Sequence, residues 1–161
     1  MSPGDPAFRA PSMFERWFNK AMGALVGLGL GPRDYYLLRV RGRTTGREYS
    51  TPVNVAELEG RRFLVAPRGR TQWVRNAEVA GEVTLAQGRV VRRFRLRAVP
   101  DGEKPPVLRA YLDRFRLTVQ RYFPLRAGSP PEAFAGIAGR YPVFEMMPSN
   151  DRERHRGEGA R

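Results

Sequence analysis

Residues 31–53 read GPRDYYLLRVRGRTTGREYSTPV, and this stretch decides the fold. Apolar side chains recur at every second position of 36–40, which is the period of a half-buried β-strand. The GRTTG sequence at 42–46 predicts a turn, and a second strand is predicted at about 49–57. Pro52 within that strand predicts an edge, bulge or strand-end position, because proline offers no N–H to a ladder. Backbone groups beside it would then stay free for another partner.

The rest of the chain alternates between helical and strand periodicities. From Ser12 onward, large apolar side chains recur three and four positions apart, which predicts an amphipathic helix that ends before Pro32. This order of elements predicts an α+β fold. It is a small, mostly antiparallel β-barrel, with the N-terminal helix and two to three further helices packed around it. The remaining strands are predicted at 62–66, 82–86, 89–99 and 142–146, and the remaining helices at 71–80, 105–122 and 131–138.

Length and local composition indicate one folded domain. A chain of 161 residues has the size of a single domain with one substantial core. Residues 1–11 hold three prolines and predict a disordered lead, and residues 149–161 are polar and predict a disordered tail. The domain is therefore predicted to span residues 12–148.

The charge of the chain is unusual. Lys and Arg number 29 against 16 acidic residues, a net charge of +13, and 15 basic against 6 acidic residues lie between 33 and 97. Such an excess attracts phosphate, polycarboxylate, nucleic acid or an anionic membrane. The chain has no Cys, and its one His, His155, lies in the polar tail. Thiol chemistry and His–carboxylate catalysis are therefore excluded from the folded part, no metal site is predicted, and a bound cofactor is expected to carry any chemistry.

Two segments together resemble a known family. The first is 31–53, in which STP at 50–52 follows the turn, and the second is 63–76, which reads FLVAPRGRTQWVRN. Their order and spacing are similar to those of the deazaflavin-dependent nitroreductase family of F(420)-dependent quinone reductases. The sequence YPVF at 141–144 fits the C-terminal strand of that family, and the likeness covers roughly residues 12–148.

The resemblance implies a split β-barrel, like the FMN-binding split barrels, that binds coenzyme F(420) in an extended groove. The basic turn would meet the phosphate and oligoglutamate tail, for which guanidinium groups and free backbone N–H groups are suited. Residues 50–52 would line the ring, Trp73 would form a wall of the pocket, and Asn76 would anchor its helix to the sheet. The predicted cofactor-binding residues are Arg43, Thr44, Thr45, Gly46, Ser50, Thr51, Pro52, Ala66, Pro67, Arg68, Gly69, Arg70, Trp73 and Asn76.

The chain departs from the family pattern at the turn. Thr44 stands where many members have Lys, and Tyr49 stands where they often have Arg, so two expected phosphate-binding charges are missing. Arg47, Arg68 or Arg70 would compensate. The loop before the pocket tryptophan is also shorter than in those members.

Plainer interpretations stay open for each feature. The GRTTG sequence is also a serviceable hairpin turn, and a Trp at helical spacing is often a core residue. The arginines at 93, 95 and 97 fit a solvated strand face. Catalytic residues are left unassigned: Tyr111, Tyr122 and Tyr141 are the candidates for a proton donor, although the first two lie on an apolar helical stripe.

The predicted activity is hydride transfer from reduced F(420) to a quinone, nitroaromatic or activated enone. The alternatives are an FMN-dependent oxidoreductase on the same barrel, or a non-catalytic member that holds F(420) or a lipid. The apolar run at 21–31 is too short to span a bilayer, so a cytoplasmic protein is predicted, with the N-terminal helix as a peripheral contact to the inner membrane face. No nucleic-acid partner is predicted, and monomer and homodimer both stay open.

Overall fold

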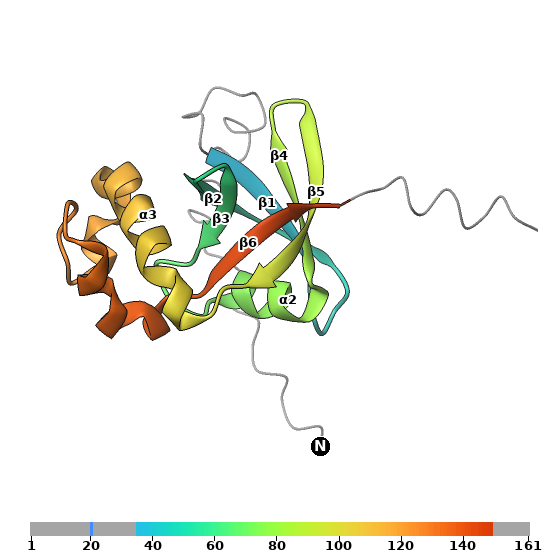
Figure 1. Ribbon diagram of the computed structural model, residues 1–161. Helices are drawn as coiled ribbons and strands as arrows, with labels where there is room; N and C mark the ends of the chain where they lie inside the picture. The colour runs from blue at the N-terminus through green and yellow to red at the C-terminus, as the bar shows by residue number, and fades with distance from the viewer. Residues whose placement is uncertain (1–19, 21–34, 150–161) are drawn as a thin grey trace, which may run out of the picture.

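The computed structural model describes residue 20 and residues 35–149. Their centre is a closed antiparallel barrel with the strand order β1–β2–β3–β6–β5–β4, in which β4 pairs back onto β1 (Figure 1). The predicted α+β split-barrel fold is confirmed. The strands are β1 (Tyr35–Arg41), β2 (Glu48–Leu58), β3 (Arg61–Val65), β4 (Glu82–Gln87), β5 (Val90–Ala98) and β6 (Val143–Pro148).

Helices cover one end and one side of this barrel. In Figure 1, α2 crosses one end of the barrel, whereas α3 and η3 lie together at its side and the β4–β5 hairpin projects at the other end. The last predicted helix forms as the 3₁₀ segment η3, and the predicted N-terminal helix, lead and most of the tail fall outside the described residues. The helical elements are α2 (Gln72–Ala80), η1 (Asp101–Glu103), α3 (Lys104–Val119), η2 (Gln120–Tyr122) and η3 (Pro131–Arg140).

Two apolar clusters hold these layers together. The first fills the barrel, where Leu38 and Leu64 are fully buried, and Val74 and Ala77 of α2 close it at one end. The second lies between the outer faces of β2, β3 and β6 and the helices α3 and η3, and it includes Leu112 and Phe134. Burial of this apolar surface is the main force that fixes the helices on the barrel.

Strand β2 pairs with β1 along its first half and with β3 along its second half. All of its first half, residues 48–54, pairs with β1, but β3 pairs only with residues 55–58. Among the described residues, no strand pairs with the other edge of 48–54. Pro52 lies in this half, opposite Leu37. It therefore has the edge position that a proline in a strand predicts.

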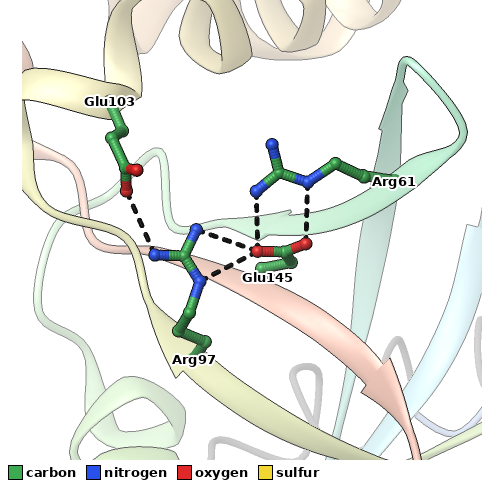
Figure 2. A network of polar contacts seen from close by, with 4 residues as sticks. All are labelled: Arg61, Arg97, Glu103 and Glu145. Carbon is green, nitrogen blue, oxygen red and sulfur yellow. Dashed lines mark hydrogen bonds and ion pairs between the residues drawn. The ribbon is translucent and has the colours of Figure 1, made fainter.

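The outer wall formed by β3, β6 and β5 carries a closed set of ion pairs (Figure 2). The Glu145 carboxylate accepts two hydrogen bonds of 2.8 Å from the Arg61 guanidinium and one of 2.9 Å from Arg97 Nε. Arg97 also donates to Glu103 of η1, at 3.1 Å. The hydrogen bonds from Arg61, and then those from Arg97, lower the pKa of Glu145 to about 2.

Candidate functional site

Three segments lie around the edge of β2 that β3 leaves uncovered. They are the turn 42–47, the edge 48–54 and the loop 66–71, and we call them together the rim. Residues 55–58 of β2 pair with residues 61–64 of β3. Beyond this paired part the two strands separate: β2 leads back to the turn 42–47, and β3 leads on to the loop 66–71. Twelve of the predicted site residues lie on the rim, and the other two, Trp73 and Asn76, lie on α2.

The turn has a compact geometry that depends on its two glycines. A Cβ at Gly42 would come within 2.5 Å of the Tyr49 ring, and Gly46 has φ +69°. The Gly42 N–H donates to the Arg47 carbonyl at 2.7 Å, and Tyr49 hydrogen-bonds the Thr45 hydroxyl at 3.2 Å. The turn is therefore held by its own backbone and side chains.

Arg43 and Asn76 connect this turn to α2. The Asn76 side chain is buried, with 5% of the residue exposed, and its Oδ1 accepts from the Arg43 backbone N–H at 3.1 Å and from Arg43 Nη1 at 2.8 Å. The same Nη1 donates to Gln72 Oε1 at 3.0 Å. Nη1 of Arg43 is thus engaged by two neutral side chains of α2, while Nε and Nη2 make no hydrogen bond among the described residues.

The loop positions one engaged arginine and one exposed arginine. Gly69 has φ +83°, and its N–H donates to the Ala66 carbonyl at 3.2 Å. Arg70 makes a bidentate pair with Glu78 of α2, with Nε at 3.1 and 3.2 Å from the two carboxylate oxygens. Arg68 is exposed, and Pro67 is half-buried. The buried Ala66 donates its N–H to Pro142, which ties the loop to the start of β6.

Two cations and two amides of the rim have no partner in the part of the chain that the structure describes. Arg47 and Arg68 are exposed, and neither side chain makes a hydrogen bond or ion pair there. The backbone N–H groups of Thr44 and Thr45 also lack an acceptor, whereas those of the other turn residues are engaged. These are the groups with which the rim could bind an anion.

Two buried polar atoms of the rim have no hydrogen-bond partner in the described part of the chain. They are Asn54 Oδ1, two residues beyond Pro52, and Thr71 Oγ1, at the end of the loop. A buried polar atom without a partner costs about 1–3 kcal/mol. Sequence analysis missed both residues, although an Asn between two valines in a strand was a visible signal. Ser50 and Thr51 lie on the same strand, opposite Arg39 and Leu38 of β1.

The aromatic candidates are mainly packing residues. Tyr141 donates its hydroxyl to the Tyr122 carbonyl at 2.6 Å and stacks on Phe123 at 4.4 Å between ring centroids. Tyr111 is 2% exposed, and burial is the main cause that raises its pKa. Trp73 is half-buried, with its ring centroid 6.2 Å from that of Phe144.

The described residues contain neither a metal-ligand cluster nor a helix that could span a membrane. Within 35–149 and at Lys20, no group of three or more His, Cys, Asp or Glu side chains could hold a metal ion. In the same part of the chain, no helix combines the length and the apolar character needed to cross a bilayer.

Comparison with known proteins gives one family match and several structural neighbours. The sequence model of the family described as F420H(2)-dependent quinone reductase matches residues 13–122, which include the whole rim and α2. Among curated proteins, none matches the chain.

The fold is similar to those of solved structures with low sequence identity. Atu2129 from Agrobacterium tumefaciens, a protein of unknown function, is 16% identical with a TM-score of 0.53, over 86% of this chain. The chain spans 58% of the length of that protein. HutZ, the heme storage protein from Vibrio cholerae, is 14% identical with a TM-score of 0.52, over 73% of this chain and 83% of its own. At such identities the likeness concerns the fold alone.

Proposed function

The chain belongs to the F420H(2)-dependent quinone reductase family, and from that premise we propose that it binds reduced coenzyme F(420) along the rim and reduces an electron-poor acceptor. The observation that carries the proposal is the family match over residues 13–122, which coincides with a rim that has two unpaired arginines. Family membership supports an F(420)-dependent oxidoreductase. The acceptor and the binding residues are the proposed part.

The rim offers the groups that this cofactor needs. F(420) carries a phosphodiester and several carboxylates on a flexible tail, and such anions bind guanidinium groups and free amides. Arg47 and Arg68 would hold the tail, together with the amides of Thr44 and Thr45. Arg43 and Arg70 would mainly fix the position of the turn and loop, because Arg43 Nη1 and the Arg70 guanidinium are bonded to α2.

The unpaired edge of β2 would receive the ring. The edge of 48–54 that faces away from β1 has no strand partner among the described residues, and Ser50 and Thr51 add hydroxyl groups. Asn54 Oδ1 and Thr71 Oγ1 are two further polar atoms of this rim that have no hydrogen-bond partner among the described residues. A polar, planar ligand on this edge would add hydrogen bonds that the described protein does not make.

The chemistry itself would come from the cofactor, since reduced F(420) is a hydride donor when bound. The contribution of the chain is to hold the ring and the acceptor together and to exclude water from between them. Neither Tyr111 nor Tyr141 is suited to supply a proton, because one is buried and the hydroxyl of the other is engaged with a backbone carbonyl. Acceptors that take a hydride and then a proton from solvent fit this arrangement, which favours quinones, nitroaromatics and activated enones.

A pair of titrations tests the cofactor. With the full chain, F(420) should bind at least roughly tenfold more tightly than FMN, which corresponds to about 1.4 kcal/mol. FMN has one phosphate and lacks the carboxylate tail, so it would use fewer of the rim cations. Equal or reversed affinities in a fluorescence titration would overturn the proposed cofactor and favour an FMN-dependent protein.

A turnover assay then tests the activity. Loss of the reduced-F(420) absorbance should depend on both the protein and an added quinone, nitroaromatic or enone. Tight binding of F(420) without turnover on any of these acceptor classes would instead identify a non-catalytic carrier of the cofactor.

A further inference from the structure

The end of the barrel opposite the turn 42–47 contains a pocket of about 240 Å³. It opens beside the β4–β5 hairpin, which projects at this end in Figure 1. Its polar lining comes from Tyr36 of β1, Arg62 of β3, Gln87 of β4 and Arg92 of β5. None of the lining residues belongs to the rim.

Arg62 is held in a fixed orientation at this pocket. Its guanidinium carbon lies 5.4 Å from the ring centroids of both Tyr36 and Phe94, so the cation packs between two aromatic rings. Nη2 donates to the Tyr36 hydroxyl at 3.0 Å, and Nε has no hydrogen bond. Nη1 has no hydrogen-bond partner either, and the nearest carboxylate oxygen in the described part of the chain, on the exposed Glu57 side chain, is 3.9 Å from Nε. Most donors of this guanidinium therefore have no acceptor among the described residues.

Further donors face the same space. The Tyr36 oxygen accepts from Arg62, so its own proton is available for another acceptor. Arg92 is exposed and has no hydrogen bond or ion pair in the described part of the chain. Gln87 Nε2 donates to the Tyr35 carbonyl at 3.0 Å, which fixes the amide at the pocket wall. Two cations and a hydroxyl thus meet here without an acidic residue in the lining.

The inner wall of the pocket is apolar. Leu85 and Phe94 line it from the barrel core and are almost completely buried, and Val90 lines it from the hairpin, where 55% of that residue is exposed. A ligand that satisfies the pocket would therefore present an anionic group to the arginines and an apolar group to the core. A planar guanidinium matches the two oxygens of a carboxylate.

We propose that this pocket is a second binding site, for a small organic carboxylate with an apolar group, separate from the rim. The carboxylate would bind Arg62 and Arg92 and accept from the Tyr36 hydroxyl, and the apolar group would contact Leu85 and Phe94. The inference does not depend on the cofactor, because none of these residues lies on the rim.

Calorimetric titration of the full chain with benzoate, at low ionic strength and without F(420), tests the site. Benzoate should bind saturably with one equivalent per chain, and neutral benzyl alcohol should bind at least roughly tenfold more weakly, since charge-assisted hydrogen bonds are the strong ones. Arg62→Gln should weaken benzoate binding by roughly tenfold or more, and Arg92→Gln should weaken it by a smaller factor. Arg95→Gln is the matched control, because it removes the same charge from the outer face of the same strand.

Three results would overturn the site. They are no saturable binding of benzoate, an equal loss in the Arg95→Gln control, and displacement of benzoate by F(420), which would assign the pocket to the cofactor. Thermal melts check the fold of each variant. If Arg62→Gln does not fold, the Arg92→Gln variant tests the site, because Arg92 is exposed. A chain that binds benzoate but not F(420) would contradict only the proposed function.

Discussion

Arginines dominate both the outer wall around Glu145 and the rim, but the two regions use them differently. On the wall, Arg61 and Arg97 each meet the same carboxylate, and Arg97 also meets Glu103 (Figure 2). On the rim, Arg43 and Arg70 are engaged with α2, whereas Arg47 and Arg68 have no partner among the described residues. A strongly basic sequence can therefore contain arginines that are paired within the fold beside arginines that have no partner among the described residues.

The difference lies in the neighbours rather than in the arginines. An arginine whose donors are filled by a carboxylate has little to offer an anionic ligand, while an exposed arginine gains from such a ligand. Net charge does not separate the two cases. We therefore expect variants on the wall to change stability and variants on the rim to change affinity.

The largest effect is expected at Asn76, where the rim is joined to the fold. Asn76→Ala removes the acceptor of two Arg43 donors and leaves a polar site unfilled, so urea denaturation should show a loss of about 2–3 kcal/mol. Gln72→Ala is the control, because it removes only one exposed hydrogen bond to the same arginine. If both variants lost the same stability, Asn76 would not be the anchor of the turn.

Glu145→Gln should give the next largest effect, on stability alone. It leaves Arg61 and Arg97 without a carboxylate, and a loss of about 2 kcal/mol near neutral pH is expected from hydrogen bonds to charged groups. The F(420) affinity should not change. Glu48→Gln is the control for stability only, because its contact with Arg39 is 3.9 Å long and exposed.

The pH dependence sharpens this prediction. The pKa of Glu145 falls from 4.5 to about 2 on folding, so its contribution is present above the unfolded value and is lost as the pH falls toward the folded one. Wild type and Glu145→Gln should therefore converge in stability between pH 4.5 and about pH 2. Parallel stability curves over that range would contradict a carboxylate that is held ionised by its neighbours.

Arg68→Gln tests the rim, with an expected effect on affinity. If this exposed cation binds the cofactor tail as proposed, its loss should weaken F(420) binding by roughly tenfold, or about 1.4 kcal/mol, without a change in melting temperature. Arg47→Gln should behave in the same way. Arg95→Gln supplies the control for net charge, and an equal loss there would show that the rim has no specific role.

Local patterns predicted most of the fold. The alternation at 36–40 and at 89–99 identified β1 and β5, and each observed boundary is within one residue of the expected one at those strands. These signals are local, since burial of every second side chain is visible within one strand. The type of the last helix was not predicted, because the 3₁₀ form of η3 does not follow from its apolar spacing.

The partners of charged residues could not be predicted in the same way. Arg43 meets Asn76 across 33 positions, and Arg61 meets Glu145 across 84. Such pairs depend on which strands become neighbours in the barrel, and the order of the strands cannot be inferred from local periodicity. The family pattern identified the segments of the rim, but which arginines remain unpaired was visible only in the structure.

The smallest effect is expected at Arg70, and it tests whether an engaged arginine can be released. Its bidentate pair with Glu78 offsets most of its charge, so Arg70→Gln should weaken F(420) binding much less than Arg68→Gln does. Because exposed charges are screened over about 8 Å at physiological ionic strength, the salt dependence of binding should also flatten less in Arg70→Gln than in Arg68→Gln.

Glu78→Gln should change the F(420) affinity in the opposite direction. It removes a nearby negative charge and frees the Arg70 donors, so the affinity at low salt should rise slightly. Titrations of the three variants over a range of salt concentrations separate these cases. If Arg70→Gln and Arg68→Gln weakened binding equally, the pair with Glu78 would open when the cofactor binds, and the distinction between engaged and unpaired arginines on the rim would fail.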